Sequence, residues 1–260
     1  MPPYLKVIMK KEISRQGEST VFEGMTSISA VLEGGYRRIE KVLCDRERTS
    51  QNRRKIDFLK HKSREAGFDI EYCAREEIDS LTTGSSHGGI IALCSGREIP
   101  SLADAEIKDH GFYVMIDGIE DPYNFGYALR TVYAAGADGV VLTPRNWMSA
   151  AGVVCRSSAG ASELLPVWCA EGEEAALFFK EKGIKVVAAG IRDSVSAFDA
   201  DLKKPVFLIV GGEKRGISAK VLAIADTIVR LDYGREFMGS LSAASSASIL
   251  AYEILRQNRK

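Results

Sequence analysis

The chain has 260 residues, of which 45% are hydrophobic and 27% are charged, and its 35 basic and 35 acidic side chains give a formal net charge of zero. This length is ample for a core and favours one large or two small domains. No apolar run approaches the roughly 20 residues that span a bilayer, which argues against a membrane-spanning helix.

The N-terminal stretch MPPYLKVIMKKEISRQ has no apolar segment of the kind that signal peptides carry. The cysteines form an odd, scattered set without a CxxC pair: Cys44, Cys73, Cys94, Cys155 and Cys169. This set indicates reduced thiols in a cytoplasmic protein rather than a disulfide framework or a zinc site. We therefore expect a cytoplasmic location, no metal and no membrane.

Residues 1–95 are predicted to form a small α/β domain. A helix begins at Thr26 or Ser27 and ends at Gly34 and Gly35, and a second helix over residues 53–67 ends at a glycine. Three short strands are expected in the sequences IEKVLCD, DIEYCA and IIALC. Residues 96–111, with a proline and mixed charge, are the linker, and residues 112–260 are the second domain.

A basic patch lies in the first domain. Between Arg37 and Arg64 there are eleven basic and four acidic residues, a surplus of seven. Clustered lysine and arginine attract phosphates whatever the nucleotide sequence, although a solvated helix face is an equal alternative. His87 is expected to structure its loop or to contact nucleic acid.

The second domain alternates helical patterns with near-continuous apolar runs, which are YVMID, GVVLT, LPVWC, KVVAAG, PVFLIVGG and TIVRLD. Such runs are typical of strands buried on both faces of a parallel sheet. The last helix is expected over residues 240–260 with Ser240 as its N-cap. Its apolar stripe is formed by Ala244, Ala247, Ala251 and Ile254.

Ligands of an open parallel sheet bind at the carboxyl ends of its strands, so the turns that follow the strands are the candidate site. In DPYNFGYALR, Asn124 can cap the helix, Gly126 permits close approach of the backbone, and Arg130 can reach back toward the strand ends. The alternative is that Asn124 is only a cap and Arg130 only part of a surface ion pair.

In LIVGGEKRGIS the glycines favour backbone amides that face a ligand. No P-loop or GxGxxG spacing is present, and Glu213 would repel a dinucleotide pyrophosphate. These features argue against a nucleotide-dependent oxidoreductase. The third turn, LDYGREFMGSLSAASSAS, is rich in small residues and leads into the last helix.

Taken together, the three turns resemble the motifs of the SpoU family of the SPOUT class, which are AdoMet-dependent RNA 2′-O-ribose methyltransferases. The first motif is matched by Asp117, Asp121, Pro122, Asn124, Gly126 and Arg130, the second by Gly211, Glu213 and Gly216, and the third by Leu231, Ser240 and Leu241. RSSAGASELLPV and ILAYE match two further segments. EGMTSISAVLEGG and GSSHGGIIAL are similar to the ribosomal-protein-like RNA-binding domain that precedes many of these enzymes.

The resemblance implies a parallel sheet with a deep trefoil knot, bound AdoMet, and an active site completed across a homodimer interface. It points to Arg130 as the residue that clamps a nucleotide phosphate and stabilises the developing alkoxide, since arginine stays protonated. It assigns ribose positioning to Asn124 and an orienting role to Glu213, and Ser242 partly replaces the family's asparagine. AdoMet is expected to contact Gly211, Leu231, Leu241 and Ala189, and RNA to contact Arg53, Arg54 and Lys55.

The third motif departs from the family, because Ser240-Leu241-Ser242-Ala243-Ala244 stands where Ser-Leu-Asn-Val-Ser is usual. Gly212 replaces a common asparagine, and LDYGREFMG replaces the usual Ile-Pro-Met loop. A catalytically weak or silent RNA-binding relative is therefore one alternative. Ribosomal RNA is the favoured substrate because of the accessory domain, and transfer RNA is the other alternative.

Overall fold

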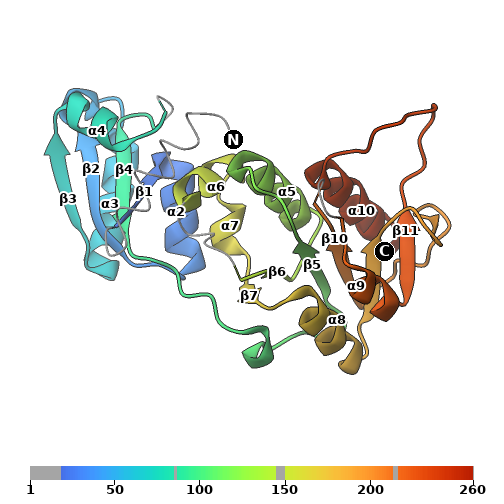
Figure 1. Cartoon of the computed structure of the whole chain (residues 1–260). Coiled ribbons are helices and arrows are strands. Elements are labelled where there is room, and N and C mark those ends of the chain that lie inside the picture. Colours follow the sequence, from blue (N-terminus) through green and yellow to red (C-terminus); the bar gives the residue numbers. More distant parts are fainter. Residues whose placement is uncertain (1–18, 85–86, 145–149, 213–215, 260) are drawn as a thin grey trace. The chain divides into compact units, whose positions relative to one another are not determined.

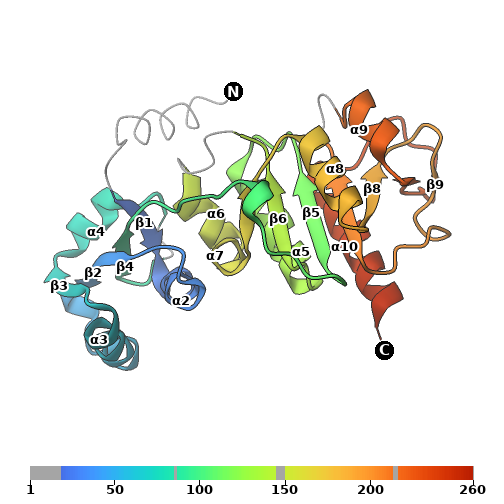
Figure 2. The same cartoon turned by 90° about the horizontal axis from the view of Figure 1, so that it is seen from below.

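The structure, a computed structural model, describes residues 19–84, 87–144, 150–212 and 216–259. The chain forms two compact units, which Figures 1 and 2 show in two views. Unit 1 comprises Met1–Glu98 and Asn146–Leu164, and unit 2 comprises Ile99–Arg145 and Leu165–Lys260. The domain limits expected from the sequence stay a prediction. The units differ from these limits, since the described residues 150–164 belong to unit 1 and not to the second domain.

Unit 1 is built on a four-stranded sheet with the order β1-β4-β2-β3, in which β2 and β3 are parallel and β4 is antiparallel to β1 and β2. Its elements are β1 (Thr20–Glu23), α2 (Gly24–Gly34), β2 (Ile39–Asp45), η1 (Arg46–Arg48), α3 (Arg53–Ala66), β3 (Asp69–Cys73), α4 (Arg75–Leu81), β4 (Ile90–Cys94), α6 (Ala151–Ser157) and α7 (Ala161–Leu164). The predicted small α/β domain is confirmed in its class.

The predicted helices of this unit are present, and α3 ends at Gly67, which adopts the left-handed conformation with φ 75°. The start of α2 differs from the prediction. The helix begins at Gly24 rather than at Thr26 or Ser27, because Gly24 has φ 77° and lets the chain turn directly from β1 into the helix. Neither β1 nor α4 was predicted.

The α6–α7 segment is held in unit 1 by a buried ion pair. Arg37 donates from Nε to Oε2 of Glu163 at 2.8 Å, and the two side chains are only 2% and 4% exposed. Arg97 donates to the carbonyl of Ser162 at 2.7 Å and lies over the ring of Tyr36. Arg37 belongs to the basic patch expected from the sequence, so this member of the patch is unavailable to a phosphate.

The thiols of unit 1 are part of its core. Burial raises the pKa of Cys94 and of Cys155 to about 12 and the pKa of Cys44 to about 11. These three side chains are therefore neutral at physiological pH and behave as small apolar groups. All five cysteines of the chain are free.

Unit 2 is built on a seven-stranded parallel sheet with the order β7-β6-β5-β10-β8-β11-β9. Its elements are η2 (Leu102–Asp104), β5 (Phe112–Ile116), α5 (Pro122–Ala134), β6 (Gly139–Leu142), β7 (Val167–Cys169), α8 (Gly172–Glu181), β8 (Lys185–Ala189), β9 (Val195–Ser196), β10 (Val206–Val210), α9 (Ala219–Ile224), β11 (Thr227–Arg230) and α10 (Ala243–Asn258). All six strands predicted for this domain are confirmed, and β9 is added.

Helices cover both faces of this sheet. Phe179 of α8 stacks on Phe207 of β10 at a centroid distance of 4.1 Å and packs against Tyr113 of β5. Because side chains alternate along a strand, the other face of β5 and β10 is left for α5 and α10, which contact each other. This double cover explains why the strands are apolar at nearly every position.

The C-terminal end of α10 is tied to the loop between β9 and β10. Oε1 of Gln257 accepts a hydrogen bond from the amide of Leu202 at 2.8 Å, and Oδ1 of Asn258 accepts one from the amide of Lys204 at 2.9 Å. These bonds fix the last helix against a segment that lies more than fifty residues earlier. The trefoil knot stays a prediction. No helix in the described part of the chain is both long and apolar enough to cross a membrane.

Candidate functional site

Four neighbouring strands of unit 2 end at one edge of the sheet, because β5, β10, β8 and β11 are parallel and adjacent. The expected cofactor residues lie there: Ala189 is the last residue of β8, Gly211 follows β10, and Leu231 follows β11. Ala189 pairs with Val229 of β11. The structure thus brings these three positions to one edge, as expected for strand-end turns.

The turn from β5 into α5 is capped by Asp121. Its Oδ1 accepts a hydrogen bond from the backbone amide of Asn124 at 2.8 Å, and Pro122 is the first helical residue. The sequence interpretation in which Asn124 caps the helix is therefore wrong, because Asn124 is the third helical residue and receives the cap. Its exposed side-chain amide has no hydrogen-bond partner among the residues that the structure describes.

The turns after β5 and β10 touch backbone to backbone. The amide of Asp117 donates to the carbonyl of Val210 at 2.9 Å, and Gly118, with φ 79°, lies against Gly212. A Cβ on Gly212 would lie 2.6 Å from the carbonyl oxygen of Gly118, and a Cβ on Gly211 would lie 2.4 Å from the carbonyl carbon of Gly216. Only glycine permits this approach, so the two turns form one continuous wall.

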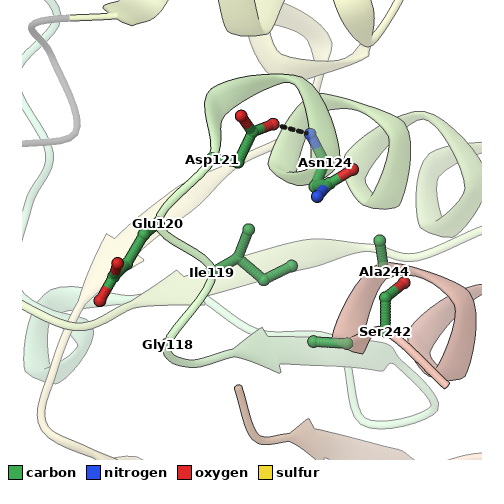
Figure 3. A pocket seen from close by; sticks show the side chains of 8 residues that line it. Gly118, Ile119, Glu120, Asp121, Asn124, Ser242 and Ala244 are labelled. Carbon is green, nitrogen blue, oxygen red and sulfur yellow. Dashed lines mark hydrogen bonds between the residues drawn. The ribbon is translucent and has the colours of Figure 1, made fainter. Parts of the chain in front are cut away.

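A pocket opens beside this wall, between the β5–α5 turn and the start of α10. Its lining residues are Gly118, Ile119, Glu120, Asp121, Asn124, Ser242, Ala243 and Ala244. In Figure 3, Asn124 from α5 faces Ser242 and Ala244 from the start of α10, and Glu120 projects to the far side of the turn. The structure therefore joins two of the expected catalytic residues, Asn124 and Ser242.

Ser242 is the N-cap of α10. Its hydroxyl accepts a hydrogen bond from the amide of Ser245 at 3.1 Å and lies 3.0 Å from the hydroxyl of Ser245. The prediction that Ser240 is the cap is wrong: the chain is still a loop at Leu241, whose amide donates to the hydroxyl of Tyr233 at 3.2 Å. Leu241, an expected cofactor residue, lies directly before this cap.

Arg130 lies on the exposed surface of α5 and is not among the residues that line the pocket. It is six residues beyond Asn124, roughly 9 Å along the helix axis and rotated away from it. Its guanidinium forms no ion pair or hydrogen bond within the described ranges. The surface ion pair considered as an alternative is therefore not present there, and one chain by itself does not bring Arg130 to the pocket. Glu213 lies outside the described residues.

Several lining residues were missed from the sequence. Gly118, Ile119 and Glu120 belong to the turn DGIED, and a glycine directly after a buried strand was the available signal. Ala244 was expected to belong to the apolar stripe of the last helix, although it also lines the pocket together with Ala243. Within the described part of the chain, no group of three His, Cys, Asp or Glu side chains is placed to hold a metal.

The expected RNA-binding residues begin α3 in unit 1. Arg53, Arg54 and Lys55 are exposed, and none of them forms an ion pair with another described residue. Other members of the basic patch are engaged, since Lys41 pairs with Glu71 and Lys62 with Glu65. The free positive charge of the patch is thus concentrated on α3.

His87 has a structural position. It is buried, its Nδ1 accepts a hydrogen bond from the amide of Gly89 at 3.1 Å, and its Nε2 lies 3.0 Å from Oδ1 of Asp79. Because Nδ1 is an acceptor, the proton is on Nε2 and is donated to the carboxylate. Both ring nitrogens are engaged, so His87 structures its loop.

Comparison with known proteins gives consistent matches. The model of the SpoU rRNA Methylase family matches residues 111–252, and a model of RNA 2′-O ribose methyltransferase substrate binding matches residues 21–100. The YacO protein of Bacillus subtilis, assigned to the TrmH family of tRNA/rRNA methyltransferases, is 30% identical over 203 residues, which are 75% of this chain and 80% of the relative. The 23S rRNA (guanosine-2′-O-)-methyltransferase RlmB of Shewanella oneidensis is 25% identical over 243 residues, which are 91% of this chain and 96% of the relative.

Solved structures match the chain over its length. The AdoMet-bound rRNA methyltransferase from Sinorhizobium meliloti superposes with a TM-score of 0.81 at 23% identity, and the match covers 99% of this chain and 96% of that chain. At this identity the likeness shows the fold.

Proposed function

Because the chain belongs to the SpoU rRNA Methylase family, we propose that it transfers a methyl group from AdoMet to a ribose 2′-hydroxyl of ribosomal RNA. The chain is an RNA 2′-O-ribose methyltransferase of this family and carries the family's substrate-binding domain. The observation that carries the proposal is the glycine wall between Gly118 and Gly212 beside a pocket that contains Asn124 and Ser242.

The strand-end turns of unit 2 fit AdoMet. Gly118 and Gly212 have no Cβ, so the turns after β5 and β10 pack backbone to backbone and form a fixed wall beside the pocket. We assign the binding of the cofactor to Gly211, Leu231, Leu241 and, at the end of β8, Ala189. When bound there, AdoMet supplies a sulfonium methyl group to a nucleophile.

The chain's own residues must prepare the hydroxyl, which is a weak nucleophile until its proton is removed. Arg130 stays protonated; it holds the nucleotide phosphate and stabilises the alkoxide that develops on the 2′-oxygen. The proton passes to the phosphate or to water. Asn124, with its amide free, positions the ribose, whereas the hydroxyl of Ser242 is already used by its cap.

A second copy of the chain supplies Arg130 in this proposal. The exposed position of Arg130 on α5, away from the pocket lining, supports a site completed in a homodimer. The contacting helices α5 and α10 also expose large side chains that a partner can cover, namely Tyr127, Tyr133, Ile249 and Tyr252.

Substitution of Gly212 by alanine tests the glycine wall. The added Cβ lies 2.6–2.7 Å from backbone atoms of Gly118, so the two turns must move apart. We expect the Kd for AdoMet, measured by calorimetry, to rise at least about tenfold, equivalent to about 1.4 kcal/mol. Gly96→Ala is the control, since its Cβ meets nothing within 4 Å. Unchanged affinity of Gly212→Ala would remove the wall from the cofactor site.

Neutralising Arg53, Arg54 and Lys55 together tests the RNA surface. Each phosphate contact contributes about 0.7–0.9 to the slope of log K against log salt concentration. We expect the triple alanine variant to bind ribosomal RNA more weakly and to lower the slope by about two. Arg75→Ala, whose arginine is exposed but paired with Asp79, is the control. An unchanged slope in the triple variant would show that α3 does not contact phosphates.

The choice of RNA rests on the accessory domain and on the RlmB relatives, whose names state 23S rRNA, whereas other relatives carry tRNA/rRNA names. Labelled AdoMet incubated with separate 23S, 16S and transfer RNA fractions tests it. Label in 23S RNA supports the proposal, and label confined to transfer RNA overturns the substrate. No incorporation together with retained RNA binding would favour the silent relative, for which the altered third motif is the support. A cytoplasmic location completes the proposal.

A further inference from the structure

The loop between β11 and α10 exposes aromatic side chains at the edge of the sheet where the pocket lies. Every residue from Asp232 to Ser240 is exposed. The ring of Phe237 is 57% exposed, and Met238 is fully exposed. The loop begins at Leu231, an assigned cofactor residue, and ends at Ser242, which lines the pocket.

The aromatic pair in this loop is held in place. The rings of Tyr233 and Phe237 meet edge to face with centroids 5.7 Å apart. The hydroxyl of Tyr233 accepts the amide proton of Leu241 at 3.2 Å, which anchors the pair to the start of α10. The tip of the Phe237 ring lies over Gly239, where a Cβ would be only 2.6 Å from Cζ. These contacts fix the ring on one edge and leave much of its surface open.

A fixed, open aromatic ring, in a loop that joins the end of β11 to the pocket residue Ser242, has one well-matched ligand in an RNA methyltransferase. Nucleobases stack on aromatic side chains whatever their identity, and RNA recognition relies on bases that are splayed out of the helix. Because the ring is already positioned, little side-chain freedom is lost on binding. Arg235, exposed in the same loop, supplies a positive charge for the backbone of the stacked nucleotide.

We propose that Phe237, positioned by Tyr233, stacks on a nucleobase of the substrate RNA and so helps to hold the RNA on unit 2. The inference rests on the proposed function, since it takes RNA as the substrate. It differs from the phosphate contacts assigned to α3, because stacking acts on the base and is largely independent of salt. Phe237 is a positioning residue and takes no part in the transfer itself.

The test uses a single-stranded RNA oligonucleotide that contains 2-aminopurine, whose fluorescence falls when the base is stacked. The full-length protein should quench the probe. Phe237→Leu should lose the quenching and raise the Kd by about five- to a hundredfold, and Phe237→Trp should restore both. The matched control is Phe198→Leu in the loop after β9, a phenylalanine that is 66% exposed and that should leave both readouts unchanged.

Three results would overturn the inference. One is quenching by Phe237→Leu equal to that of the unaltered chain. Another is an equal loss in Phe198→Leu. The last is a loss of dimerisation: if light scattering shows that the unaltered chain is a dimer and Phe237→Leu is a monomer, the loop belongs to an interface between copies of the chain. Methyl transfer measured in parallel separates the two proposals. If the unaltered chain is active and Phe237→Leu still quenches the probe, only the stacking proposal is refuted. If the unaltered chain quenches the probe but transfers no methyl group, only the proposed function is refuted.

Discussion

Replacing Arg130 with alanine is expected to lower kcat for methyl transfer at least about a hundredfold, as the loss of one group that stabilises a developing oxyanion does. The Kd for AdoMet should stay within about twofold, because Arg130 lies outside the pocket lining. The melting temperature should not change, since the side chain is exposed and has no partner in the described part of the chain. Single-turnover kinetics with calorimetry measures both quantities.

Arg130→Lys is the matched control for charge. The lysine keeps the positive charge but lacks the planar fork of the guanidinium. The kcat of Arg130→Lys should therefore lie between that of Arg130→Ala and that of the unaltered chain. Coexpression of Arg130→Ala with Gly212→Ala tests the second copy, because a mixed dimer contains one site with an intact arginine and an intact wall. Partial recovery of activity is expected. Turnover of Arg130→Ala close to that of the unaltered chain would refute the role of this residue.

Removing one partner of the buried pair between Arg37 and Glu163 is expected to destabilise unit 1 by about 3–5 kcal/mol. Either alanine variant leaves the other charge buried with its partner gone, since both side chains are almost fully enclosed. In Arg37→Ala, the carbonyl of Ser95 also loses a hydrogen bond. Urea unfolding followed by circular dichroism measures the loss.

The double variant Arg37→Met with Glu163→Leu is the control for this second prediction. Replacement of both charged side chains by apolar ones of similar size removes the cost of desolvating the charges as well as their attraction. The free energy of unfolding of the double variant should therefore be close to that of the unaltered chain. Single variants that unfold at the same urea concentration as the unaltered chain would show that the pair contributes nothing to the attachment of the α6–α7 segment.

Six of the seven strands of unit 2 could be predicted because each lies in a near-continuous apolar run. Val206–Val210, for example, is buried at every position, and such runs indicate a parallel sheet covered by helices. The two-residue strand β9 has no comparable signal. The attachment of α6 and α7 to unit 1 was also hidden, because it depends on Arg37 and Glu163, which are 126 positions apart.

The site could be placed at the strand ends but not built from the sequence. Two residues, Asp121 and Asn124, were both eligible to cap α5, although Pro122 at the first helical position already favours Asp121. The choice of Ser242 over Ser240 as the cap of α10 depends on the bond from Leu241 to Tyr233. The contact of Gly118 with Gly212 joins turns that are more than ninety residues apart, and no local pattern indicates it.

The position of the transferred methyl group tests the central claim most directly. The protein is incubated with isotope-labelled AdoMet and ribosomal RNA, the RNA is digested to nucleosides, and mass spectrometry locates the label. The account predicts label on the ribose 2′-oxygen of one nucleoside, and its loss with Arg130→Ala. Label on a base, or label that is unaffected by Arg130→Ala, would contradict the account.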